Sequence, residues 1–363
     1  MSSSKKKICF FTTVDWFILT HRKKLLRELI KSYDVTVIVF ENTKKLEISF
    51  PKLEILSLNI SRSNVSFFKN ILSFFKLFKI SNKKKFDLFY VVGVRSIFFT
   101  LLLEIFIKSS FLYTFSGLGT LFMSKGFTLS TYKTLLKILV YFSKSNIIVQ
   151  NQEDLNLIKS YSKPEKKITC ILGSGVDLET FKPSRVKKLK KIIFVGRLLK
   201  SKGILEYIEL AKRSKKYDLE FNIYGSIDDN LESIKQRDLK NLPKQVIFHG
   251  NSNKISDEMS DASIIILPSK REGLSLTLCE AAASGLVLIT YDVPGCREVC
   301  INNYNGFLCE FENIDALQKS VIKVISDEKN FKKMSANSRK LAIKNFDINI
   351  INKKIIQEIE VFF

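Results

Sequence analysis

Short apolar runs that alternate with longer segments of helical spacing constrain the fold of this chain more than any other feature. In the first half, the runs occupy residues 7–12, 35–40, 54–58, 88–92, 111–115, 147–150 and 168–172. The helical segments between them are residues 18–31, 65–80, 96–108, 129–143 and 152–161. Unbroken apolar runs of this length are typical of strands buried on both faces. The alternation predicts parallel strands joined by helical crossovers.

A second series of the same kind follows. Its strands are expected at residues 192–195, 221–224, 246–249, 264–267, 286–290 and 307–309, and its helices at 204–213, 255–261, 276–284 and 314–325. Residues 328–363 have helical spacing with a break near 345–349, and 175–183 have no clear period before the basic run 185–191. A chain of 363 residues can hold two sizeable cores. We predict an α/β protein with two Rossmann-like, doubly wound domains, at residues 1–175 and 191–345, a linker at 176–190 and a C-terminal helix at 346–363.

The formal net charge of +23 calls for an anionic partner or surface. Nucleic acid, acidic lipid head groups and phosphorylated small molecules all satisfy that requirement. A lysine-rich composition can also raise the charge without any functional reason. The sequence has no helix-turn-helix, zinc or RNA-recognition pattern, so we expect no nucleic-acid partner.

The six cysteines form no C-x-x-C pair, which favours a reduced, cytoplasmic protein. Cys296 and Cys300 are close in sequence, but the chain has only two histidines and neither lies near them. We therefore expect no metal and no other cofactor. The first seven residues lead directly into a strand, so no signal peptide is expected. No apolar run reaches the roughly 18 residues of a transmembrane helix.

Two carboxylates flank the turn that follows the expected strand 264–267. Glu272 lies in that turn, at the carboxyl end of the strand, where open α/β sheets bind ligands. Ser275 is placed to cap a helix that carries Glu280 and ends at Gly285. The backbone N–H groups of residues 274–277 would be free at the positive end of that helix. This layout suits a ligand with phosphates in the middle and hydroxyls at both ends, as in a nucleotide-sugar.

Two cations occupy the equivalent position after the first strand of the second series. Arg197 follows the strand at 192–195, and Lys202 precedes the helix at 204–213. Together they can bind a diphosphate, with the arginine acting as a bidentate donor. An isolated loop lysine is usually only solvated. Here the cations are expected at the same sheet edge as Glu272, which favours a site.

These residues form motifs that resemble glycosyltransferase family 4. The motifs are Val195-Gly196-Arg197, Lys202-Gly203, Glu272 and Glu280 with their spacing, 281–285 (Ala-Ala-Ala-Ser-Gly), and 294–298 (Pro-Gly-Cys-Arg-Glu). The resemblance implies retaining enzymes of the GT-B fold, with two Rossmann-like domains facing a cleft. It also implies a C-terminal helix that returns to the first domain, and no metal.

The resemblance assigns roles to individual residues. Arg197 and Lys202 would hold the donor diphosphate, Glu272 would contact the donor sugar, and Glu280 would bind the nucleoside ribose. Glu272, Arg197 and Lys202 would form the catalytic set. The other donor contacts would come from backbone atoms of Gly273, Leu274 and Ser275, with Gly196 and Gly295 bordering the ligand.

The first half departs from the family pattern. It has no glycine-rich loop after the first strand and no histidine near residues 91–95. Instead, His21 and Arg22 are expected to begin a helix, where they could bind an acceptor phosphate; a structural role for His21 is the alternative. The segment 116–119, followed by 125–127, resembles transferases that extend polyprenyl-diphosphate-linked glycans. Gly117 and Gly119 would then let a loop approach the acceptor, although an ordinary turn explains them as well.

Residues 65–89 combine phenylalanines with lysines. A helix of this composition could lie on an anionic membrane. A crossover helix with its apolar stripe on the sheet is the other interpretation, and one helix can do both.

The function expected is transfer of a sugar, an N-acetylhexosamine such as N-acetylgalactosamine, from a UDP-sugar to a polyprenyl-diphosphate-linked saccharide. The enzyme would act at the inner face of the cell membrane as a peripheral protein. Two alternatives remain open on the sequence alone. One is a basic, non-catalytic binding protein on the same scaffold, and the other is a sugar-nucleotide epimerase of the same fold.

Overall fold

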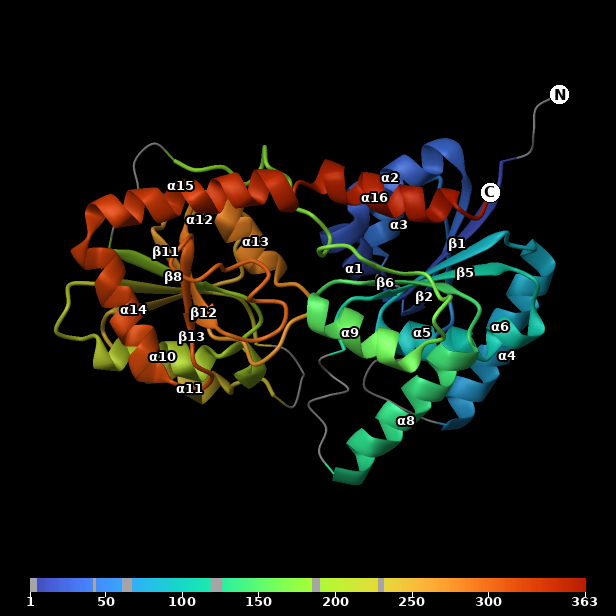
Figure 1. Ribbon diagram of the computed structural model, residues 1–363, viewed down its shortest axis with the longest axis horizontal. Coiled ribbons are helices and arrows are strands. Elements are labelled where there is room, and N and C mark those ends of the chain that lie inside the picture. Colours follow the sequence, from blue (N-terminus) through green and yellow to red (C-terminus); the bar gives the residue numbers. More distant parts are fainter. Residues whose placement is uncertain (1–4, 42–43, 61–66, 119–125, 185–189, 228–231) are drawn as a thin grey trace. The chain divides into compact units, whose positions relative to one another are not determined.

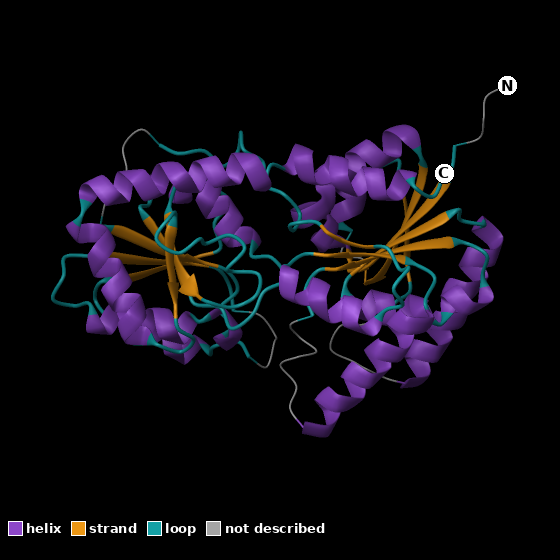
Figure 2. Ribbon diagram, viewed as in Figure 1, coloured by secondary structure: helices purple, strands orange, loops and turns teal. Residues whose placement is uncertain are grey.

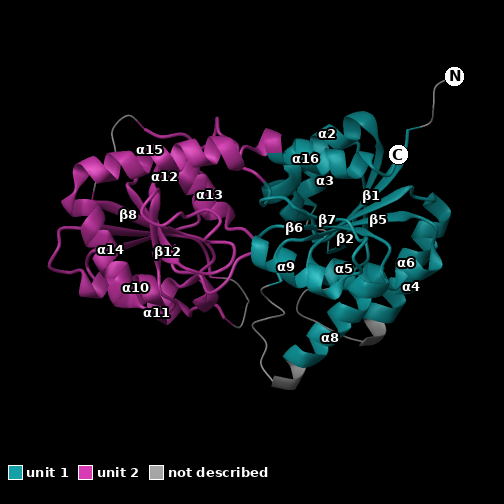
Figure 3. Ribbon diagram, in the orientation of Figure 1, with its two compact units in different colours: residues 1–174, 351–363 teal, residues 175–350 magenta. Residues whose placement is uncertain are grey.

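The computed structural model describes residues 5–41, 44–60, 67–118, 126–184, 190–227 and 232–363. The chain forms two compact units, one comprising residues 1–174 with 351–363 and the other residues 175–350 (Figure 3). Each unit has one sheet with helices on both of its faces (Figure 2). All thirteen predicted strands are present, and each unit is described separately below.

The sheet of the first unit has seven strands in the order β3-β2-β1-β4-β5-β6-β7 (Figure 1). All neighbouring strands are parallel. The strands are β1 (Lys7–Val14), β2 (Asp34–Glu41), β3 (Glu54–Ser57), β4 (Leu88–Val92), β5 (Ser110–Phe115), β6 (Asn146–Val149) and β7 (Ile168–Cys170). Successive residues of β1 face opposite sides, so Cys9 and Phe11 enter one core while Ile8 and Phe10 enter the other.

Two sets of helices cover this sheet. One face is covered by α4 (Phe67–Lys84), α5 (Val94–Leu101), α6 (Leu103–Phe106), α8 (Gly126–Phe142) and α9 (Gln152–Tyr161). The other is covered by a helical stretch of α1 (Asp15–Phe17), a π-helical turn (Ile18–Arg22) and α2 (Lys23–Ser32), with α3 (Lys45–Ser49) and α16 (Ile348–Glu360).

The C-terminal helix belongs to the first unit, as predicted. Ile351, Ile355 and Ile359 of α16 are at most 1 % exposed and lie in the core with strands β1, β2 and β4. Their spacing of four residues places them on one face of the helix. The break expected near residues 345–349 separates α16 from α15 (Glu328–Asn345).

The sheet of the second unit has six parallel strands in the order β10-β9-β8-β11-β12-β13. They are β8 (Lys191–Val195), β9 (Glu220–Tyr224), β10 (Val246–Gly250), β11 (Ile264–Leu267), β12 (Val287–Tyr291) and β13 (Gly306–Cys309). The helices are a 3₁₀ turn (Lys200–Lys202), α10 (Ile204–Arg213), α11 (Gln236–Lys240), α12 (Ile255–Asp261), α13 (Leu276–Ala283), α14 (Ile314–Ser326) and α15. The two short helices α3 and α11 lie outside the predicted segments.

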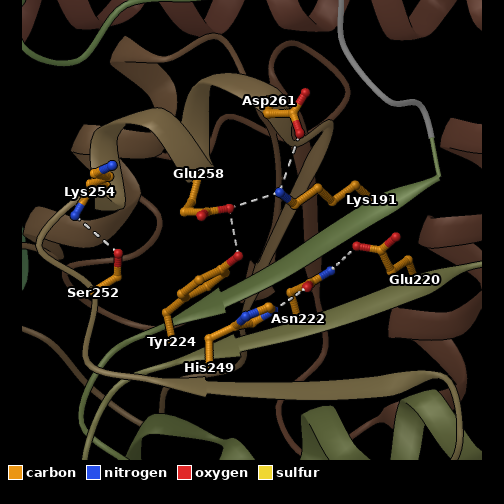
Figure 4. Close-up of polar contacts among 9 residues, drawn as sticks. All are labelled: Lys191, Glu220, Asn222, Tyr224, His249, Ser252, Lys254, Glu258 and Asp261. Carbon is orange, nitrogen blue, oxygen red and sulfur yellow. Dashed lines mark hydrogen bonds and ion pairs between the residues drawn. The ribbon is translucent and has the colours of Figure 1, made fainter.

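A polar network links α12 to the sheet of the second unit (Figure 4). Lys191 is 7 % exposed, and its Nζ donates to Glu258 Oε2 at 2.9 Å and to Asp261 Oδ2 at 3.4 Å. The Tyr224 hydroxyl donates to the same Glu258 oxygen at 2.6 Å. The His249 ring stacks on Tyr224, with 4.5 Å between the ring centroids. These groups satisfy one another, so the network holds α12 in place.

Each sheet has a point where the strand order reverses. In the first unit it lies between β1 and β4, and in the second it lies between β8 and β11. Crossovers leave such a point in opposite directions, which opens a crevice at the carboxyl ends of the two strands. The segments after β8 and β11 carry Arg197, Lys202 and Glu272. Topology therefore brings the predicted donor residues to one sheet edge.

Candidate active site

Lys202 and Glu272 form an ion pair at the reversal point of the second unit. Lys202 Nζ donates to Glu272 Oε1 at 2.5 Å, although the two residues are 70 positions apart in sequence. Their side chains are 25 % and 11 % exposed, respectively. The Ser269 hydroxyl donates to the same carboxylate oxygen at 2.8 Å. Glu272 therefore holds the lysine at the sheet edge and partly neutralises it.

Gly203 lets the 3₁₀ turn pass close to the end of β11. Its φ is +79°, and a Cβ atom there would lie 2.2 Å from the carbonyl oxygen of Pro268. Only glycine fits this combination of backbone angle and contact. The close approach is what brings Lys202 within reach of Glu272.

The loop at residues 294–295 supports the loop that carries Glu272. The Glu272 N–H donates to the Pro294 carbonyl at 3.0 Å, and the Ser275 N–H donates to the Gly295 carbonyl at 2.9 Å. Gly295 has a φ of +80°, and a Cβ there would lie 2.5 Å from the Glu272 carbonyl oxygen. The Gly295 N–H donates to Glu298 Oε2 at 2.7 Å. The two loops thus pack backbone against backbone.

This arrangement corrects one prediction. The Ser275 N–H was expected to be free for a phosphate, but it is bonded to Gly295 because the glycine allows the loops to approach. Ser275 does cap α13, and its hydroxyl accepts from the Leu278 N–H at 3.4 Å. The donor contacts expected of Gly273 and Leu274 stay predictions.

Glu280 is the fifth residue of α13; the residue as a whole is partly exposed, but its carboxyl group is buried. Burial of its carboxyl raises its pKa from 4.5 to about 8. The free enzyme therefore holds this carboxyl mostly protonated at neutral pH. Arg197, which directly follows Gly196 after β8, has an exposed side chain.

The residues predicted to bind the acceptor lie after β1 and β5 of the first unit. The helix begins at Asp15, so His21 and Arg22 lie beyond its first turn, inside the π-helical turn. The expectation that they begin a helix was wrong, because residues 15–17 are already helical. The His21 ring stacks on Phe17, with centroids 4.7 Å apart, and its Nδ1 lies 2.6 Å from the Thr20 hydroxyl.

Arg22 is a buried cation. Its side chain is 1 % exposed, and its Nη1 donates to the Gly173 carbonyl at 3.3 Å. Its Nε and Nη2 atoms are buried and have no hydrogen-bond partner among the residues that the structure describes. A guanidinium seeks up to five acceptors, so two unsatisfied nitrogens leave it able to bind an anion.

Gly117 directly follows the bend after β5 and has a φ of +107°. The next N–H, of Leu118, donates to Asp154 Oδ2 at 3.3 Å. Gly119 lies outside the described residues. Ser269 was not among the predicted site residues. Its position one residue after Pro268, at the end of β11, is the signal that could have identified it.

No group of three or more His, Cys, Asp or Glu side chains in the described part of the chain could hold a metal ion. Likewise, none of the helices described is both long and apolar enough to cross a membrane.

Comparison with known proteins identifies the family. The family model "Glycosyl transferase 4-like" matches residues 7–151, and "Glycosyl transferases group 1" matches residues 176–341. The two matches together cover most of both units. This chain belongs to the glycosyltransferases. It is therefore an enzyme of the hexosyltransferase class, as the sequence predicted.

Relatives of this glycosyltransferase act in bacterial glycan synthesis. One is the N,N'-diacetylbacillosaminyl-diphospho-undecaprenol alpha-1,3-N-acetylgalactosaminyltransferase of Campylobacter jejuni, 24 % identical over 89 % of this chain and 90 % of the relative. Another is the UDP-Gal:alpha-D-GlcNAc-diphosphoundecaprenol alpha-1,3-galactosyltransferase of Escherichia coli, 26 % identical over 78 % of each chain. A third is the capsular polysaccharide biosynthesis glycosyltransferase CapM of Staphylococcus aureus, 29 % identical over 66 % of this chain and 67 % of the relative.

Solved structures show the same fold. The sucrose-phosphate synthase of Thermosynechococcus elongatus matches 99 % of each chain with a TM-score of 0.82 at 16 % identity. Anabaena HepE in complex with UDP and glucose matches 98 % of this chain and all of that one, with a TM-score of 0.81 at 16 % identity. The predicted GT-B fold of two Rossmann-like domains is thus confirmed for the glycosyltransferase.

Proposed function

We propose that this glycosyltransferase moves an N-acetylhexosamine, such as N-acetylgalactosamine, from a UDP-sugar to a polyprenyl-diphosphate-linked saccharide. The relatives from Campylobacter and Escherichia act on sugars linked to undecaprenyl diphosphate. The Lys202–Glu272 pair at the β8/β11 reversal carries the proposal, because it sets a cation and a carboxylate where a nucleotide-sugar would lie. The sugar transfer would take place at the inner face of the cell membrane, where the enzyme would be a peripheral protein.

The second unit would hold the donor. Arg197 and Lys202 would bind the diphosphate, Glu280 would accept hydrogen bonds from the ribose hydroxyls, and Glu272 would contact the sugar. Gly196, Gly273, Leu274 and Gly295 would shape the pocket. Because Lys202 is held by Glu272 before the donor arrives, little rearrangement is needed when leaving-group charge develops.

The reaction would retain the configuration of the sugar. Both relatives form alpha linkages, and UDP-hexoses carry the alpha anomer. The bond between the anomeric carbon and the diphosphate oxygen breaks while the acceptor hydroxyl bonds that carbon on the same face. The departing diphosphate oxygen takes the hydroxyl proton. The enzyme contributes orientation and charge stabilisation.

The donor assignment is tested with a panel of UDP- and GDP-sugars and short-chain polyprenyl-diphosphate acceptors. Lys202→Met should lower kcat on the order of 10²-fold with the best donor. Lys200→Met is the matched control, since Lys200 is an exposed lysine in the same 3₁₀ turn. Equal activity of the two variants would show that Lys202 does not serve the reaction. Activity that persists with a chelator is expected, because the cations replace a metal.

The first unit would bind the acceptor through the buried guanidinium of Arg22. His21, Gly117 and Gly119 remain the other residues predicted to serve the acceptor. The two unsatisfied nitrogens of Arg22 suit a diphosphate. Arg22→Met should raise KM for the acceptor at least about tenfold and leave KM for the donor unchanged. Arg22→Lys separates charge from folding, because it keeps the cation, and it should recover part of the acceptor affinity. An equal loss for donor and acceptor would contradict this assignment.

The two alternative functions predict different experimental results. An epimerase would change the sugar when incubated with the donor alone, whereas a transferase would need an acceptor. A non-catalytic protein that binds nucleic acid would give a strong, salt-dependent gel shift and no turnover.

A further inference from the structure

Helix α8 is apolar on two opposite faces. Leu136 and Val140 are 1 % exposed and pack into the core beneath the sheet. Leu135, Ile138 and Phe142 follow one another at helical spacing and are 42 %, 48 % and 72 % exposed. A helix that packs on a core with one face normally presents polar residues on the other. The outward stripe of α8 therefore lacks an explanation within the unit.

Helices α6 and α4 extend this apolar surface. Ile105 and Phe106 of α6 are 73 % and 63 % exposed, and Leu72 and Phe75 of α4 are 70 % and 61 % exposed. The rings of Phe78 and Phe106 join α4 to α6, with centroids 6.3 Å apart. All three helices cover the same face of the sheet, below it in Figure 1. Of the twenty large hydrophobic residues that are exposed in the described chain, ten lie in α4, α6 and α8.

A groove runs between α6 and α8. It has a volume of about 420 Å³. Five apolar residues line it together with Glu104, Ser143 and Lys144; the apolar ones are Leu101, Ile105, Ile138, Leu139 and Phe142. Glu104 holds the end of α8 beside it, since its carboxylate accepts from the Ser143 hydroxyl at 2.9 Å and from the Lys144 N–H at 2.7 Å. The apolar stripe of α8 is thus fixed in place.

The surface is also strongly basic. Helices α4 and α8 contain no acidic residue, and Glu104 of α6 is engaged with α8. Lysines of the described surface occur along α4 at positions 76, 79 and 83 and along α8 at positions 133 and 137, whereas Lys84 of α4 is paired with Glu54. Apolar residues flanked by lysines match the boundary of an anionic bilayer, where acyl chains lie beneath acidic head groups.

We propose that the exposed face of α4, α6 and α8 docks on an anionic lipid bilayer, with the groove between α6 and α8 receiving an acyl chain. A second copy of this chain fits less well, because an isologous contact would place lysines against lysines. This docking rests on the proposed function, because an enzyme that transfers sugar to a lipid-linked acceptor has to reach the membrane that holds the acceptor.

The test is cosedimentation of the full chain with vesicles of phosphatidylglycerol and phosphatidylethanolamine, compared with phosphatidylcholine alone. No donor or acceptor is added. We expect binding to the anionic vesicles that weakens at high salt. Ile105→Asp and Ile138→Asp should each lower the affinity at least about tenfold, because a carboxylate opposes both insertion and lipid charge.

Matched controls exist for both variants. Ile48→Asp is made at a 79 % exposed position of α3, on the opposite side of the same sheet, and Ile343→Asp at a 48 % exposed position of α15. Both should bind vesicles like the wild-type chain. Absence of wild-type binding, or equal losses in the controls, overturns the proposal. So does self-association in sedimentation velocity that Ile105→Asp abolishes while vesicle binding is absent.

A second measurement separates this inference from the proposed function. With a short-chain, water-soluble acceptor and no vesicles, Ile105→Asp and Ile138→Asp should turn over at the wild-type rate. With the acceptor embedded in anionic vesicles, they should be slower by about the loss in vesicle affinity. Vesicle binding without transfer to any lipid-linked acceptor would refute the proposed function and leave the docking surface standing.

Discussion

Replacing Glu280 by glutamine should change how the stability of the second unit depends on pH. Burial raises the pKa of this carboxyl from 4.5 to about 8 in the folded protein. The unfolded chain ionises near the ordinary value, so folding is favoured by the neutral carboxyl and opposed by the charged one. The stabilisation is complete below pH 4.5 and is lost as the pH rises to about 8.

The size of the effect follows from the two pKa values. Each pH unit between them costs about 1.4 kcal/mol, because only the unfolded chain gives up the proton there. At pH 7 the loss of stabilisation amounts to about 3 kcal/mol, and above pH 8 it levels off at about 5 kcal/mol. Glu280→Gln carries no titrating group at this position. As the pH rises, the free energy of unfolding of the wild-type protein should therefore fall by these amounts relative to that of the variant.

Urea unfolding at pH 5, 6, 7 and 8, followed by far-UV circular dichroism, measures the difference. Trp16 is the single tryptophan and lies in the first unit, so its fluorescence reports separately on that unit and should show no change. Glu310→Gln, at an exposed position of the second unit, is the control. A stability difference between wild type and Glu280→Gln that stays constant from pH 5 to pH 8 would refute the reasoning.

The Glu280 carboxyl should also couple donor binding to the release of a proton. Ribose hydroxyls donate to a carboxylate, so UDP binding at pH 7 should release close to one proton from Glu280. Calorimetric titration in two buffers of different ionisation enthalpy measures that number. Glu280→Gln should bind UDP more weakly and release none.

Three further predictions concern the second unit. A double-mutant cycle of Lys202→Met and Glu272→Gln should give a coupling of about 1–3 kcal/mol in urea unfolding, because either single change leaves a partly buried charge without its partner. Gly295→Ala should cost about 2–3 kcal/mol and raise KM for the donor, since its Cβ would lie 2.5 Å from the Glu272 carbonyl oxygen. Lys191→Met should cost about 1–3 kcal/mol at pH 7. Although burial favours the neutral form of Glu258, the bonds from Tyr224 and Lys191 lower its pKa, so this last difference should shrink as the pH falls below 4.5.

Much of the fold could be predicted because the pattern of apolar residues within a short segment reflects how that segment is buried. Strands buried on both faces need unbroken apolar runs such as residues 264–267. Short apolar runs marked all thirteen strands, including the only partly buried edge strands β3, β7 and β10. The N-cap at Ser275 was predictable for the same reason, since the hydroxyl bonds an N–H three residues away. Helix α6 was predicted as part of one long helix, because the break at Leu102 changes no periodicity.

The candidate site was predictable in part. Arg197, Lys202 and Glu272 each follow a predicted strand or precede a predicted helix, which places them at the carboxyl edge of a parallel sheet. The sequence gives no signal that Lys202 and Glu272 bond directly. It also gives none that the Ser275 N–H is consumed by Gly295, since both contacts depend on how closely two loops approach.

The sequence alone thus determined which segments are strands and helices, and which polar residues end up at sheet edges, because periodicity and capping act over a few residues. Tertiary structure alone decided that β8 lies beside β11, that Arg22 is buried with two nitrogens that no described residue satisfies, and that α8 turns a second apolar face outward. Each of these depends on which distant segments become neighbours. That choice is made by the free energy of packing the whole chain, and no local window of residues contains it.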